Sequence, residues 1–133
     1  MSLKQPHILV VDDDEDFISI ISQKLASSGF AVSLAHNGRE GYDRALQLKP
    51  DLILMDVQMP EMDGIETLLK MREREELKHI KVMFLTAYGE DQPGVYETDQ
   101  RYAKELGAVE YILKNEDLNA VVARIRKLLN HDS

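Results

Sequence analysis

Five short runs of apolar residues alternate along the chain with segments in which apolar residues recur at helical spacing. Most of the runs are rich in Val, Ile, Leu or Met, and each stops at a polar or charged residue, as buried strands often do. They cover residues 8–11, 31–35, 52–55, 81–85 and 109–113. Strands that are joined through helices by short connections pair in parallel, and their helices cover both faces of the sheet. We therefore expect one doubly wound α/β domain, a (βα)5 unit, over residues 6–130, with short tails at 1–5 and 131–133.

The segments between the runs are expected to be helices. The first follows the acidic residues 12–16 and ends at Gly29. Its apolar positions are Phe17, Ile20, Ile21 and Leu25. The others cover about 38–49, 65–75, 99–106 and 118–129, and the third is expected to turn Ile65, Leu68, Leu69 and Met71 inward. Residues 88–98 have no clean period, so we expect a long loop there.

The composition excludes several classes of function. A net charge of −8 and a pI of about 4.9 argue against binding to nucleic acid or to an anionic membrane surface, because both need a basic face. The absence of cysteine rules out disulfides, cysteine-ligated zinc and thiol catalysis, and is in keeping with a reducing cytosol. No apolar run approaches the ~20 residues of a spanning helix. We expect a cytoplasmic chain without a second domain.

Acidic, hydroxyl and ammonium side chains stand where the expected strands end. Asp12 and Asp13 follow the first strand, and Asp56 follows the third. Thr86 follows the fourth strand and Lys114 the fifth. Because the carboxyl ends of parallel strands share one edge, where open α/β sheets bind ligands, we expect these side chains to converge there.

Such a cluster predicts particular chemistry. Carboxylates in close contact repel one another unless a cation lies between them, and an all-oxygen donor set favours Mg²⁺. Lys114 and the Thr86 hydroxyl could then hold a phosphoryl oxyanion while a carboxylate attacks the phosphorus atom. Taken singly, each residue has an ordinary explanation: Asp56 as a turn cap, Thr86 as a turn residue and Lys114 as a solvated cation. Only their joint placement favours a site.

Four motifs together carry a resemblance to a known family. They are Val10-Val11-Asp12-Asp13, Asp56-x-x-Met59-Pro60-x-Met62-Asp63-Gly64, Thr86-Ala87 and Tyr111-x-x-Lys114. Each motif is weak alone, but all four in this order on successive expected strands are specific. The chain resembles the receiver domain of response regulators in two-component signalling, over about residues 6–130.

The resemblance implies a flavodoxin-like sheet with strand order 2-1-3-4-5. It implies that Asp56 accepts a phosphoryl group from the phosphohistidine of a histidine kinase or phosphotransfer protein, or from a small acyl phosphate. The cofactor implied is Mg²⁺, held by Asp13, Asp56 and the backbone carbonyl of Gln58, with Asp12 acting through water. On this view the chain is a signalling phosphoprotein that assists its own phosphorylation and dephosphorylation.

Three further roles follow from the same resemblance. Thr86 and Lys114 would contact the phosphoryl oxygens. Thr86 and Tyr111 would form a switch, in which the tyrosine rotates and changes a surface for a downstream effector protein or domain. The cognate kinase and the effector are not identified by these residues.

The sequence departs from the family pattern at two places. Asn115 follows the lysine where the family usually has a proline with a cis bond. Because a non-proline cis bond costs roughly 2.5–4 kcal/mol, we expect a trans bond or a rearranged loop after Lys114. The stretch from Thr86 to Lys114 is also longer than usual, with the surplus expected within residues 88–98.

Two other functions stay open at the level of the sequence. Asp12-Asp13-Asp14 spells the Asp-x-Asp motif of haloacid-dehalogenase-like phosphatases, in which Asp12 would be the nucleophile. That alternative leaves Asp56 and its Met-Pro loop unexplained. The chain could instead be an unswitched receiver-like module that only binds proteins.

Overall fold

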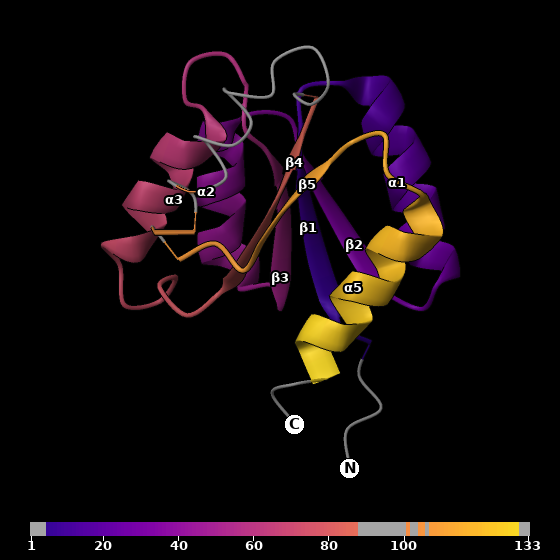
Figure 1. Cartoon of the computed structure of the whole chain (residues 1–133). Helices are drawn as coiled ribbons and strands as arrows, with labels where there is room; N and C mark the ends of the chain where they lie inside the picture. Colours follow the sequence, from indigo (N-terminus) through magenta and orange to yellow (C-terminus); the bar gives the residue numbers. More distant parts are fainter. Residues whose placement is uncertain (1–4, 88–100, 102–103, 106, 131–133) are drawn as a thin grey trace.

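The computed structural model describes residues 5–87, 101, 104–105 and 107–130. A five-stranded sheet occupies its centre, with every pair of strands parallel and the order β2-β1-β3-β4-β5 (Figure 1). The strands are β1 (His7–Val11), β2 (Ala31–Ala35), β3 (Leu52–Asp56), β4 (Lys81–Thr86) and β5 (Glu110–Leu113). The predicted parallel sheet and its strand order are confirmed.

Helices cover both faces of this sheet. They are α1 (Glu15–Ser27), α2 (Gly38–Leu48), α3 (Gly64–Arg72) and α5 (Leu118–Asn130). Figure 1 shows α2 and α3 on one face and α1 and α5 on the other. The loop expected at 88–98 lies outside the described residues, as does much of the helix expected at 99–106. Bounds are therefore available for four of the five expected helices. Gly107 has a φ of 100°, a left-handed conformation that glycine adopts readily.

The alternation of side chains along the strands produces two apolar layers. In β1, Leu9 and Val11 pack with α2 and α3, whereas Ile8 and Val10 pack with α1 and α5. All four are almost completely buried. A strand with both faces covered must be apolar at every position, which is why the central runs carry no polar alternation. The first polar groups along β1 and β3 therefore appear where these strands reach the edge of the sheet.

Acidic residues begin two of the helices that leave this edge. Asp14 is the N-cap of α1 and accepts from the backbone N–H of Asp16 and Phe17. Asp63 caps α3 in a reciprocal capping box with Glu66. Each such cap stabilises a helix by about 1 kcal/mol. Capping accounts for Asp14 and Asp63, but not for the acids that precede Asp14.

The third helix is shorter than predicted. The sequence predicted a helix to residue 75, but α3 ends at Arg72. Beyond it, the N–H of Arg74 donates to Met71 O at 3.1 Å, and the N–H of Leu77 donates to Arg74 O at 3.1 Å. These bonds span three residues instead of four, so the chain tightens and turns. Leu77 is fully buried and holds this turn against the core.

The prediction that Leu69 points inward was wrong, because its side chain is 39% exposed. Ile20, one of the apolar positions at helical spacing in α1, is 57% exposed, whereas Ile18 and Thr67 are buried in their helices. The Thr67 hydroxyl donates to Asp63 O at 2.8 Å, so its burial leaves no unpaired donor. Within the described part of the chain, no helix has the length and apolar character needed to cross a membrane.

Candidate functional site

Three carboxylates meet at the carboxyl edge of the sheet. Asp12 and Asp13 follow β1, and Asp56 is the last residue of β3. One carboxylate oxygen from each lies within 4.8 Å of the others. Asp12 is 1% exposed and Asp56 is 6% exposed, whereas Asp13 faces solvent. The prediction that these three residues converge is confirmed.

Lys114 reaches the same place from the turn after β5. Its backbone N–H donates to Thr86 O at 2.8 Å, which fixes the turn to the end of β4. Its Nζ lies 2.7 Å from Asp12 Oδ2 and 3.4 Å from Asp56 Oδ2. The described peptide bonds include none in the cis form, so the predicted trans bond before Asn115 is confirmed. The missing proline does not prevent Lys114 from reaching the carboxylates.

Burial and charge shift the protonation equilibria of this cluster. Burial, and after it the charge of Asp12, raise the pKa of Asp56, while Lys114 and a backbone hydrogen bond from Gln58 lower it, and the net result is a pKa raised from 3.8 to about 7. Burial by itself lowers the pKa of Lys114, but the hydrogen bond to Asp12 and the charge of Asp56 outweigh it and leave that pKa raised. The single ammonium group therefore does not fully compensate the buried carboxylates.

This imbalance, together with the donor set, fits a hard divalent cation. The donors are all oxygens, and they come close enough together to share one ion. Asp12 Oδ2 is buried, and the Lys114 ammonium lies 2.7 Å from it. Its lone pairs are thus directed into the cluster. Asp12, Asp13 and Asp56 are the side chains that could hold a metal ion.

Thr86 lies on β4, which pairs with β3, and Tyr111 lies on β5, which pairs with the other side of β4. Thr86 ends β4 and is 2% exposed, and Tyr111 in β5 is 1% exposed. The Tyr111 ring contacts that of Phe84 edge-on, with centroids 5.9 Å apart. Thr86 and Phe84 are two residues apart, so they share a face of the sheet. The structure thus places Tyr111 inside the core on the side of α2 and α3, with its ring turned inward.

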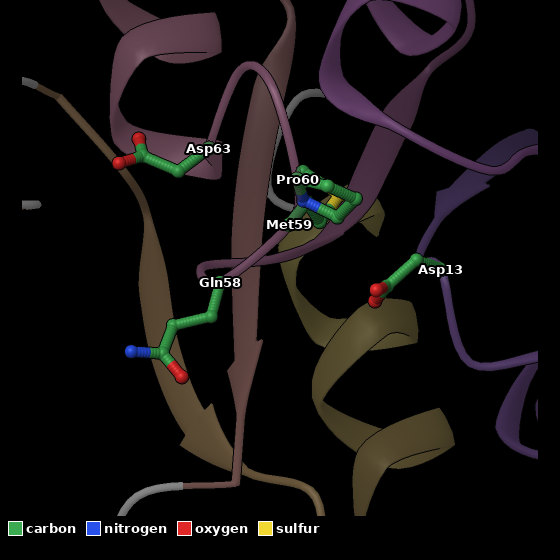
Figure 2. Close-up of a pocket in the computed structure, with 5 residues that line it drawn as sticks. All are labelled: Asp13, Gln58, Met59, Pro60 and Asp63. Atoms are coloured by element: carbon green, nitrogen blue, oxygen red, sulfur yellow. The ribbon is translucent and has the colours of Figure 1, made fainter.

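The loop between β3 and α3 forms an open pocket beside the carboxylates. The pocket has a volume of about 420 Å³, and its lining residues are Asp13, Gln58, Met59, Pro60 and Asp63. Figure 2 shows Asp13 entering from the end of β1, while the other four come from the loop. In this view the Gln58 side chain extends away from Asp13. A small ion or molecule can therefore approach the edge of the sheet beside Asp13.

Two residues that shape the site were not predicted from the sequence to belong to it. Gly64 begins α3, and a Cβ there would collide with the carbonyl oxygen of Asp56 and with the Phe84 ring. Its place directly after Asp63 was a signal of a turn or helix start, but not of this close approach. Phe17 was assigned only to the apolar side of α1. Its ring also lies against Lys114 Nζ, a contact that no spacing rule predicts.

Comparison with known proteins identifies the class. The sequence profile described as the response regulator receiver domain matches residues 8–126. The chain is 36% identical over 124 residues to the DNA-binding dual master transcriptional regulator RpaA of Synechocystis sp., covering 93% of this chain and 49% of that protein. It is also 36% identical over 122 residues to the alkaline phosphatase synthesis transcriptional regulatory protein PhoP of Bacillus subtilis, covering 92% of this chain and 48% of that protein. The chain thus spans about half the length of these relatives.

A solved structure agrees with these relatives. The crystal structure of a putative response regulator from Chloroflexus aurantiacus superposes with a TM-score of 0.85 and 26% identity, covering 96% of this chain and 99% of that one. The chain belongs to the receiver domains of response regulators, which are proteins of two-component signalling. The alternative of a haloacid-dehalogenase-like phosphatase is not favoured, and Asp12 is held by the N–H of Asp14 at 2.9 Å and by Lys114.

Proposed function

We propose that this receiver domain is a phosphorylatable switch in which Asp56 accepts the phosphoryl group. The observation that supports the proposal most strongly is the placement of Asp56 beside both a cation and two further carboxylates at the edge of the sheet. A phosphoryl group that arrives there meets Lys114 as a counter-charge. The donor that we propose is the phosphohistidine of a histidine kinase or phosphotransfer protein, or a small acyl phosphate.

The transfer is a displacement at phosphorus. A carboxylate oxygen of ionised Asp56 attacks the phosphorus atom and forms a P–O bond. The bond from phosphorus to the donor, P–N in phosphohistidine or P–O in an acyl phosphate, breaks and its electron pair leaves with the donor. Lys114 stabilises the negative charge on the transferred oxygens, and the role that we propose for the hydroxyl of the buried Thr86, at the end of β4, is to contact one of them.

Mg²⁺ is the cofactor that we propose for this step. Asp13 and Asp56 would bind it through their carboxylates, the carbonyl of Gln58 would complete the protein ligands, and Asp12 would act through water. When bound, the ion supplies positive charge that keeps Asp56 ionised and neutralises phosphoryl oxygens. The raised pKa of Asp56 in the chain alone supports a need for that charge.

The output that we propose is a change in the surface formed by β4 and β5. The pull of a phosphoryl group on Thr86 would free space along the face where Phe84 and Tyr111 pack, so that Tyr111 could rotate toward the surface. The partners are then a histidine kinase or phosphotransfer protein upstream and an effector protein or domain downstream. Because these donors are formed inside the cell, the proposal also places the domain in the cytoplasm.

Incubation with acetyl phosphate tests the proposal. With excess Mg²⁺ we expect one phosphoryl adduct in the intact mass of the wild-type chain, and with EDTA we expect the adduct to fall at least tenfold, because the carboxylates then lose their counter-charge. Sodium chloride at the same ionic strength serves as the matched control for a general effect of salt.

The contrary outcomes are distinct. No adduct with Mg²⁺ would indicate the unswitched binding module. Continuous turnover of a phosphate ester without a lasting adduct would indicate a phosphatase.

A further inference from the structure

One aromatic side chain lies against the cation of the site. Nζ of Lys114 is 4.8 Å from the centre of the Phe17 ring, within the ~6 Å over which a cation–π attraction acts. The electron-rich face of an aromatic ring attracts an ammonium group electrostatically, in addition to any apolar packing. The ring of Phe17 therefore supplies a third contact to an ammonium that also meets Asp12 and Asp56.

Phe17 is held in place by elements that do not depend on Lys114. It lies in the first turn of α1, and its backbone N–H donates to the N-cap Asp14 at 3.2 Å. Its side chain packs against the apolar cluster between the sheet and helices α1 and α5. A phenylalanine has only two side-chain torsions to fix, so the helix orients the ring at small entropic cost.

Lys114 depends much more on its surroundings. It lies in a turn that the N–H of Glu116 closes onto Leu113 O at 3.2 Å, and its flexible side chain must extend from this turn to the carboxylates. The carboxylates cannot hold it equally well before and after phosphoryl transfer, because Asp56 Oδ2, which lies 3.4 Å from the Lys114 ammonium, belongs to the group that would be modified. The ring of Phe17 keeps the same charge distribution throughout.

From these contacts we propose that Phe17 is a positioning residue, whose ring face holds the Lys114 ammonium at the edge of the sheet both before and after phosphoryl transfer to Asp56. The inference rests on the proposed function, in which Lys114 stabilises the transferred phosphoryl group. Phe17 itself touches no reacting atom. Its effect on the chemistry passes entirely through Lys114.

Fluorination of the ring separates cation–π attraction from packing. Incorporation of 3,4,5-trifluorophenylalanine at position 17 keeps the shape of the side chain and removes the negative potential of its face. We expect the maximal rate of labelling by acetyl phosphate to fall roughly 3- to 10-fold, with little change in the half-saturating concentration. The matched control is the same replacement at Phe30, whose ring faces Arg126 Cζ at 5.9 Å away from the carboxylates, and there we expect no change.

A second readout does not need phosphoryl transfer. The ring current of Phe17 should move the NMR signals of the Lys114 Cε protons upfield, and Phe17→Leu should return them to ordinary values. Phe17→Tyr, which keeps the ring, should preserve both the upfield shift and the labelling rate.

The outcomes distinguish this inference from the proposed function. If the wild-type chain is labelled but trifluorination at position 17 has no larger effect than at Phe30, Phe17 is a packing residue and the inference is wrong. If the wild-type chain is not labelled at all, the proposed function fails. The NMR shifts then decide the positioning claim alone, and ordinary shifts for Lys114 in the wild-type chain would overturn it.

Discussion

At pH 8 and without divalent cations, the Asp56→Asn variant is expected to be more stable than the wild-type chain by about 2 kcal/mol. A carboxyl group whose pKa is about 7 in the folded chain and 3.8 when unfolded reduces the free energy of unfolding by at most roughly 4 kcal/mol once it is ionised in both states. Asparagine has nearly the same shape but carries no charge. Part of the gain is lost because Lys114 then has one ionic partner fewer.

The pH dependence of this difference has a definite sign. Below pH 3.8 the Asp56 carboxyl is protonated in both the folded and the unfolded chain, so the two proteins should be about equally stable. As the pH rises from 3.8 through 7, the unfolded chain loses this proton first, and the wild-type chain loses stability relative to the variant. Above the folded pKa of about 7 the difference should stay constant.

Urea unfolding at several pH values measures this effect. Asp43→Asn, at an exposed position on α2, is the matched control and should show little change. Mg²⁺ at one hundred times the dissociation constant of its complex with the wild-type chain should stabilise that chain by about 2.7 kcal/mol. This gain should offset the higher stability of Asp56→Asn. A variant that is less stable than the wild-type chain at pH 8 would contradict the account of Asp56 as a strained, partly uncompensated carboxylate.

The Lys114→Met variant is expected to be labelled by acetyl phosphate 10²- to 10³-fold more slowly than the wild-type chain at saturating Mg²⁺. Methionine approximates the length of the lysine side chain but cannot stabilise charge that develops on the phosphoryl oxygens, and loss of one such preorganised group typically costs this much. Lys114 is the ammonium that lies within 4 Å of both Asp12 and Asp56.

Two controls separate this effect from others. Lys127→Met, on the exposed side of α5, should leave the rate unchanged. Because removal of Lys114 also takes away an influence that lowers the pKa of Asp56, rates should be compared up to pH 9, where the carboxylate is ionised in both proteins. Recovery of the full rate at pH 9 would show that Lys114 acts only by keeping Asp56 ionised, and not on the phosphoryl group.

The framework of this domain is predictable from its sequence because simple rules govern it. Buried parallel strands must be apolar along their whole length, and parallel strand ends share one edge. The convergence of Asp12, Asp13, Asp56 and Lys114 follows from these two rules. The residue at which each strand ends is therefore enough to predict that these side chains lie close together.

Other features depend on contacts between distant parts of the chain, which the spacing of apolar residues in the sequence does not predict. Helical spacing allows Ile20 as readily as Ile18 on the inner side of α1, and only the fit against the sheet decides that Ile20 is exposed. The end of α3 is set by turns that bury Leu77, a long-range contact. The approach of Phe17 to Lys114 joins residues from the two ends of the chain, so it is visible only in the folded structure.

The most direct test of the central claim is the identity of the carboxylate that carries the phosphoryl group. Reduction of an acyl-phosphorylated aspartate with borohydride converts that residue to homoserine, and peptide mass spectrometry then locates it. After incubation of the wild-type chain with acetyl phosphate and Mg²⁺, we predict homoserine at position 56 alone and none in Asp56→Asn. Homoserine at position 12 or 13, or labelling of Asp56→Asn equal to that of the wild-type chain, would contradict the account.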